Sequence, residues 1–305
     1  DETGGLRGRA ELYACLPSEV TAPLFGEIHA TVLMSATLRP FEVIQDVLAV
    51  PDPVTMAYGD PFPRDRRRTY AVDVPALYAR NRSDTGVQAS ITEVLTDSIR
   101  MTPGNTLAFF PSYAEAERYY HRVETEATPY LDRPGVRAED LRKRFVQDDH
   151  AVLFTSLWGT LTEGVSYDGD DARTVCVVGV PYPHLDDRME AVQRAYRGAF
   201  GDEKNASGHD DPGWKYAVEI PTVRKTRQAL GRVVRSPDDF GARILIDERY
   251  TTSEAAELGQ YSVNGTFPEE ERDELIDIGP GKLKFGLSNF YVDMDAWGGH
   301  GPPTP

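Results

Sequence analysis

Gln228-Ala-Leu-Gly-Arg-Val-Val-Arg235 is the most informative stretch of this sequence. On a helix of 100° per residue, Gln228, Arg232 and Arg235 fall within roughly 60° of one another on one face. The opposite face carries apolar residues, namely Val223, Leu230 and Val234. Two guanidinium groups beside a carboxamide, with room left by Gly231, are suited to gripping phosphate oxygens. The stretch therefore predicts an anion site on an amphipathic helix.

The composition is that of a globular protein. The 305 residues are 40% hydrophobic, which is enough for a sizeable core in one large domain or two smaller ones. No stretch is long enough to span a membrane, and the first residues do not form a signal peptide, so we expect a cytoplasmic protein with no membrane partner. Cys15 and Cys176 are the only cysteines, too few to hold an iron–sulfur cluster in this chain.

The net charge of −16, taken alone, argues against nucleic acid as a partner. Lysine is rare, however, and arginine carries most of the positive charge. An acidic, lysine-poor surface suits a halophilic protein that must stay hydrated in high salt. Under that interpretation the overall charge says little about the ligand, and the local arginines say more.

Strand-like and helical segments alternate along most of the chain. Strands are expected at 31–35, 66–74, 106–110, 151–156, 173–180 and 242–246, and helices at 41–49, 85–101, 112–127, 139–147, 185–200 and 214–235. Alternation of this kind predicts an α/β fold in which helices flank a parallel sheet. Within it we expect Cys176 and Trp158 in the core, and Asp247 with Arg249 as a structural pair.

Ligands of open parallel sheets bind at the carboxyl ends of the strands. Four segments are expected at such ends: residues 35–38, 111–113 and 159–164, and the arginine helix. The side chains and glycines that could contact a ligand there are Ser35, Thr37, Ser112, Tyr113, Thr160, Glu163 and Gly164.

These segments resemble helicase motifs in the order in which helicases carry them. Ser35-Ala-Thr-Leu38 resembles motif III, and Phe109-Phe-Pro-Ser-Tyr113 resembles motif IV. Gly159-Thr-Leu-Thr-Glu-Gly-Val-Ser-Tyr167 is similar to motif V, and the stretch from Gln228 to Arg235 is similar to motif VI, of XPD/DinG-type superfamily-two DNA helicases. The resemblance covers roughly residues 31–290.

The resemblance implies two RecA-like lobes with ATP and Mg²⁺ bound between them. Arg232 and Arg235 would then contact the phosphates as arginine fingers, and Gln228 would organise them. Glu163, Gly164 and Gly231 would belong to the nucleotide cleft, and Glu163 and Gly164 would couple it to the nucleic-acid track. The residues expected along single-stranded DNA are Ser35, Thr37, Ser112, Tyr113 and Thr160.

The chain departs from that family pattern in two ways. Ser166 stands where the family usually carries Asp, and no Gly-x-x-x-x-Gly-Lys-Ser/Thr phosphate loop occurs. We therefore expect residues 1–60 to be the end of the first lobe with a linker, 61–290 the second lobe, and 291–305 a disordered tail. The missing N-terminal lobe would be the partner, and this chain alone would be inactive.

Two other functions are compatible with parts of the pattern. A non-catalytic docking module for nucleic acid or protein would keep the fold, and Ser166 and the acidic surface favour it. An unrelated α/β enzyme that binds a phosphorylated metabolite would explain the arginines, but it would not explain four ordered segments.

Overall fold

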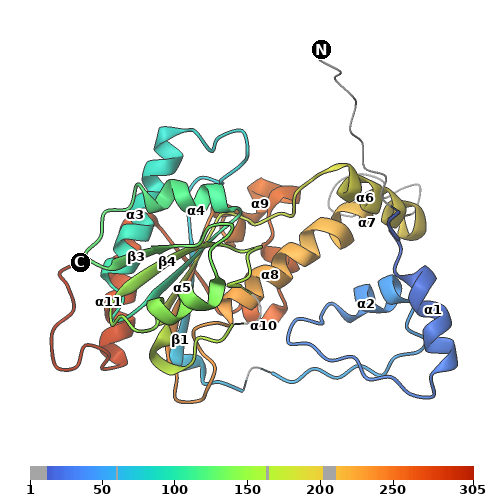
Figure 1. Ribbon diagram of the computed structural model, residues 1–305, viewed down its shortest axis with the longest axis horizontal. Helices are drawn as coiled ribbons and strands as arrows, with labels where there is room; N and C mark the ends of the chain where they lie inside the picture. The colour runs from blue at the N-terminus through green and yellow to red at the C-terminus, as the bar shows by residue number, and fades with distance from the viewer. Residues whose placement is uncertain (1–11, 60, 163–164, 202–210) are drawn as a thin grey trace, which may run out of the picture. The chain divides into compact units, whose positions relative to one another are not determined.

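A computed structural model describes residues 12–59, 61–162, 165–201 and 211–305 of the chain. The chain divides into two compact units, Asp1–Met56 with Leu185–Ala217 and Ala57–His184 with Val218–Pro305 (Figure 1). The first division lies near the expected boundary at residue 60. Residues 185–217, which we expected inside the second lobe, group instead with the N-terminal unit.

The smaller unit is helical in the part that the structure describes. Its helices are α1 (Ser18–Glu27), α2 (Phe41–Leu48), α6 (Asp187–Phe200) and α7 (Pro212–Trp214). The Thr21 hydroxyl donates to the Leu48 carbonyl oxygen at 2.6 Å and ties α1 to the end of α2. Arg197 forms an ion pair with Asp211 at 2.6 Å, which fixes the start of α7 against α6.

Residues 31–35 do not form the buried strand that their apolar run predicts. They have no strand conformation, and Val32 and Met34 are 77% and 86% exposed. An apolar run becomes a buried strand only when neighbouring strands pair with it. None of the described residues pairs with this segment, so the prediction of a strand here is wrong.

The larger unit is built on one parallel sheet. Its strands are β1 (Arg67–Val72), β2 (Thr106–Phe110), β3 (Thr128–Leu131), β4 (Ala151–Ser156), β5 (Thr174–Val178), β6 (Gly241–Ile246) and β7 (Leu275–Ile278). They lie in the order β3-β4-β2-β5-β6-β1-β7, and every pair is parallel. The predicted parallel α/β fold is confirmed.

Helices cover both faces of this sheet (Figure 1). One face packs against α3 (Thr85–Arg100), α4 (Tyr113–Tyr120) and α11 (Leu283–Asp293). The other face packs against α5 (Ala138–Phe145) and α8 (Ile220–Leu230). The remaining helices, α9 (Ala255–Leu258) and α10 (Glu269–Arg272), are short. Because both faces are covered, β2, β4 and β5 are buried along their whole length.

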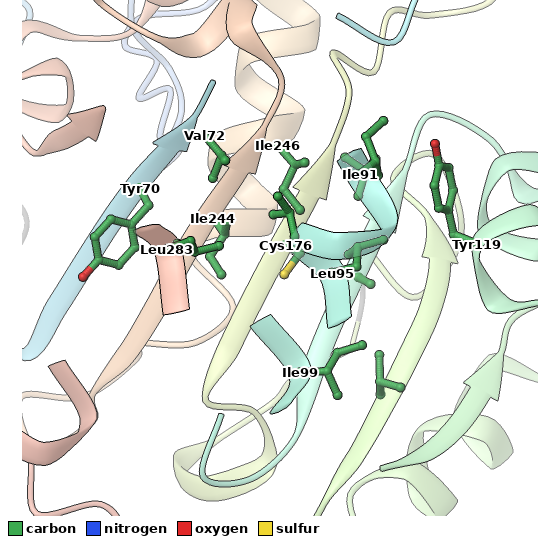
Figure 2. Close-up of a cluster of buried hydrophobic side chains, with 14 of the residues drawn as sticks. Tyr70, Val72, Ile91, Leu95, Ile99, Tyr119, Cys176, Ile244, Ile246 and Leu283 are labelled. Atoms are coloured by element: carbon green, nitrogen blue, oxygen red, sulfur yellow. The ribbon is translucent and has the colours of Figure 1, made fainter. Parts of the chain in front are cut away.

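Figure 2 shows the core on the α3 face. Ile91, Leu95 and Ile99 of α3 are fully buried and recur at a spacing of four residues, which places them on one side of the helix. They pack over Cys176 of β5 and Ile244 of β6. The Asp84 carboxylate accepts the backbone N–H groups of two residues in the first turn and caps α3.

The tail of the chain holds structure that the sequence pattern does not reveal. The weakly patterned region after residue 251 contains β7 and α11. Helix α11 reaches Asp293, and Ala296 and Trp297 pack against the core, although we expected a disordered tail from residue 291. Helix α4 ends at Tyr120, earlier than the expected helix over 112–127. Strand β3, which was not expected, begins just after that range.

A buried ion pair joins the loops that follow three strands. Arg249 contacts Asp247 through two hydrogen bonds of 2.7 Å, and both side chains are at most 2% exposed. Burial disfavours the charged guanidinium, but the Asp247 charge outweighs it and raises the pKa of Arg249. Asp247 also accepts the backbone N–H of Leu77 at 3.0 Å. The expectation of a structural pair is confirmed.

Among the described residues, no helix combines the length and the apolar character that crossing a membrane requires.

We expect Arg249→Ala to destabilise the protein by about 3–5 kcal/mol, because it leaves Asp247 buried without its counter-charge. Lys143→Ala is the matched control, since Lys143 and Glu139 form an ion pair with side chains 61% and 54% exposed. The control should cost less than about 1 kcal/mol. Denaturant unfolding followed by circular dichroism measures both, and equal costs would contradict the role of the buried pair.

Cys176 should be inert in the native protein. It is fully buried, and burial raises the pKa of its thiol to about 12, so the reactive thiolate is scarce below about pH 10. In a Cys15→Ser variant, we expect an aromatic disulfide reagent to react with no thiol of the folded protein at pH 8. After denaturant is added, it should react with one thiol per chain. Rapid labelling of the folded variant would show that this core is open.

Candidate functional site

The arginine-rich stretch is not one continuous helix. Helix α8 ends at Leu230, and Gly231 is its C-cap with φ −73° and ψ 7°. Val233 and Val234 then pack into the core as the chain leads into β6. The prediction of a helix to residue 235 is wrong, because a helix-weakening glycine and two β-branched valines follow one another here.

The turn before β6 is fixed by one carboxylate. Asp239 accepts the backbone N–H groups of Arg235 and Ser236, each at 2.9 Å. Gln228, Arg232 and Arg235 therefore do not share a helical face. Arg232 and Arg235 instead both contact residues of the loop that follows β4.

Arg232 binds the loop that follows β4. Its guanidinium donates to the backbone carbonyl oxygens of Thr162 and Val165. These two carbonyls lie on either side of Glu163 and Gly164, the predicted motif V residues, which lie outside the described part of the structure. The arginine stretch and the motif V loop are therefore joined directly, through the backbone.

Arg235 contacts the same loop farther along. Its Nη1 forms an ion pair with Asp168 Oδ1 at 3.0 Å, and the two side chains are 36% and 74% exposed. A pair this exposed contributes little to stability, so a stronger anion could take its place. Arg235 is thus the more accessible of the two predicted phosphate ligands.

Gln228 has a buried carboxamide oxygen, Oε1, without a hydrogen-bond partner among the described residues. Such atoms are uncommon in folded proteins and indicate that a donor is supplied from elsewhere. Gly231 is exposed, and a Cβ there would meet only ordinary contacts, the nearest being the Arg227 carbonyl oxygen at 3.5 Å. The space at Gly231 therefore gives no steric reason for glycine.

Ser166 replaces the expected aspartate in the motif V loop. Its backbone carbonyl oxygen accepts a hydrogen bond from Arg142 of α5 at 3.0 Å. Residues of this loop are thus contacted both by α5 and by the arginine stretch.

A second group of predicted residues gathers where β2 and β4 end. The Ser112 hydroxyl accepts the Glu115 N–H at 3.2 Å and caps α4, as its sequence position predicts. The Tyr113 hydroxyl accepts the backbone N–H of Thr160. Burial and the nearby charge of Asp132 raise the pKa of Tyr113, although the Thr160 contact opposes them.

Gly159 allows this close approach. A Cβ at Gly159 would lie 2.6 Å from the Tyr113 hydroxyl oxygen and 3.0 Å from the Ser156 carbonyl oxygen. A side chain at this position would therefore require the Tyr113 ring to move.

The four candidate segments do not all meet at one edge of the sheet. Residues 111–113 and 159–162 follow the carboxyl ends of β2 and β4, as expected. The arginine stretch instead precedes β6 and enters it at the amino end. Ser35 and Thr37 belong to the smaller unit, where the Ser35 hydroxyl accepts the Thr37 backbone N–H at 3.1 Å in a local turn.

Trp158 is not the core residue that we expected. It is 40% exposed in the loop after β4. The residue before it, Leu157, is fully buried and takes the core position instead. Position in a loop directly after a buried strand end is the signal that could have placed Trp158 at the surface.

Comparisons with known proteins agree on one family. The sequence model named Helicase C-terminal domain matches residues 95–261, which is more than half of the chain. The chain is 22% identical over 265 residues to General transcription and DNA repair factor IIH helicase subunit XPD/RAD3 of Saccharomyces cerevisiae, covering 78% of this chain and 32% of that protein.

A Regulator of telomere elongation helicase 1 homolog of Drosophila sechellia is 24% identical over 302 residues, covering 86% of this chain and 30% of that protein. The chain thus spans about a third of the length of these relatives. Among solved structures, one titled XPD_Helicase matches with a TM-score of 0.63 at 22% identity, covering 87% of this chain and 45% of that one. The larger unit has the RecA-like fold of that structure. On the extent of the family match, this chain belongs to the helicase C-terminal domain family.

Proposed function

We propose that the larger unit is the second motor lobe of an ATP-dependent DNA helicase, and that ATP binds between it and a first lobe. The observation that carries the proposal is that Arg232 and Arg235 both contact residues that follow β4, namely Thr162, Val165 and Asp168. The loop after β4 would then contact both the residues that bind the nucleotide and the residues that bind the nucleic acid.

The donor set fits a triphosphate. Arg235 can exchange the exposed Asp168 carboxylate for the phosphate oxygens of a triphosphate, which carry more negative charge and also fit its planar fork. Its positive charge would stabilise the negative charge that develops during phosphoryl transfer. Gln228 would help to organise the phosphates by donating hydrogen bonds from its amide NH₂ group, because its Oε1 can only accept them.

Arg232 has a different role in this proposal. Its guanidinium already donates to the carbonyl oxygens of Thr162 and Val165. A movement of Arg232 when the cleft opens or closes would therefore move these residues of the motif V loop. Glu163, Gly164 and Gly231 would complete that side of the cleft. Mg²⁺ would accompany ATP, and we assign none of its ligands, and no iron–sulfur ligand, to this chain.

Single-stranded DNA would run past Ser112, Tyr113 and Thr160 at the carboxyl ends of β2 and β4. Ser35 and Thr37 of the smaller unit would contribute from the end of the first lobe. We assign residues 1–60 to that lobe end and its linker, and the larger unit, Ala57–His184 with Val218–Pro305, to the second lobe. Cytoplasmic DNA repair is the setting in which we place the intact protein.

In the protein that carries both lobes, we expect Arg235→Ala to lower ATP turnover by about 10³–10⁵-fold, because a guanidinium that meets the transition state is lost. Arg232→Ala should also lose turnover while nucleotide binding survives in part. Steady-state ATPase assays and nucleotide titration separate turnover from binding.

Arg100→Ala is the matched control. Arg100 is 37% exposed against 36% for Arg235, and it forms an ion pair with Asp97 at 2.9 Å, although Asp97 is 12% exposed against 74% for Asp168. It should retain normal turnover. Normal ATPase in Arg235→Ala would defeat the finger assignment and leave the lobe as a docking module.

The 305-residue chain alone should not hydrolyse ATP, because the phosphate loop of the first lobe is not part of it. The measurement is phosphate release by the purified chain with Mg²⁺ and single-stranded DNA. Turnover stimulated by DNA under those conditions would show that this chain carries its own catalytic machinery.

A further inference from the structure

An exposed tryptophan lies beside the proposed DNA track. Trp158 follows β4 and is 40% exposed, whereas large aromatic rings are mostly buried in folded proteins. Its neighbours Gly159 and Thr160 contact the Tyr113 hydroxyl, so Trp158 is part of the same loop segment as the residues assigned to DNA.

The ring is held in place from two further elements. The indole N–H donates to the Pro181 carbonyl oxygen, after β5, at 3.2 Å. The ammonium of Lys225, on α8, lies 5.4 Å from the ring centroid. A ring fixed in this way loses little conformational freedom when something stacks on it.

The contacts also define what the ring can recognise. Because its N–H is already bonded to the protein, Trp158 offers a stacking surface and no free hydrogen-bond donor. Stacking on an aromatic face accepts every base. Lys225 adds one positive charge next to the ring, where the phosphate that follows a stacked base would lie.

We propose that Trp158 and Lys225 form a stacking platform for one base of single-stranded nucleic acid. This inference rests on the proposed function, in that the lobe must bind a single strand. The platform extends the track from Tyr113 toward the loop after β5, and it makes binding independent of base sequence.

The first test uses the full chain and a fluorescently labelled oligothymidylate, with binding followed by anisotropy. Trp158→Ala should weaken binding about 5- to 150-fold, corresponding to the ~1–3 kcal/mol of one stacked base. Trp158→Phe should restore most of the affinity. The matched control is Phe285→Ala, because Phe285 is 51% exposed with Lys284 5.7 Å from its centroid, on the helix that follows the edge strand β7. It should bind like the parent.

Salt dependence separates the two parts of the platform. Lys225→Ala should lower the slope of log affinity against log salt by about 0.7, the value for one phosphate contact on a single strand. Trp158→Ala should leave the slope unchanged. A reduced slope in Trp158→Ala would mean that its effect is electrostatic and not stacking.

The outcomes distinguish this inference from the function beneath it. If the parent chain binds the oligonucleotide and Trp158→Ala binds equally well, the platform is wrong and the DNA track stands. If the parent chain does not bind the oligonucleotide at all, the proposed DNA track is wrong, and the platform that depends on it is wrong as well. Circular dichroism of each variant confirms that the fold is intact, and quenching of tryptophan fluorescence on binding should be lost in Trp158→Phe.

Discussion

The loops that follow β1, β5 and β6 depend on one buried ion pair. Asp247 holds the backbone after β1 through Leu77, and Arg249 stacks its guanidinium on Tyr78 and Tyr182, with centroid distances of 4.6 and 5.6 Å. A buried charge is tolerated only when its partners are complete, and here they come from three loops. The pair therefore fixes the positions of these three loops at the carboxyl end of the sheet.

The loop after β4 connects the two groups of candidate residues. At its start, Gly159 and Thr160 contact Tyr113, and farther on Thr162, Val165 and Asp168 bind the two arginines. In the proposed function, a change at the nucleotide would reach the DNA track through this loop.

Much of the fold could be predicted from sequence pattern. The apolar runs of β2, β4 and β6 and the periodicity of α3 gave their positions to within a few residues, because buried faces impose these periods. The pattern was wrong at residues 31–35, where the apolar run has no partner strands. It missed β3 and β7, which are short strands at the sheet edges with few buried positions.

The sequence by itself determined the family, the parallel α/β architecture, and which residue types could bind phosphate, since these follow from local periodicity and from ordered motifs. Tertiary structure decided where the side chains point. It ended α8 at Leu230 and brought Arg232 and Arg235 into contact with residues that follow β4. It also placed Trp158 at the surface beside Lys225. These are contacts between residues far apart in the chain, and no local pattern encodes them.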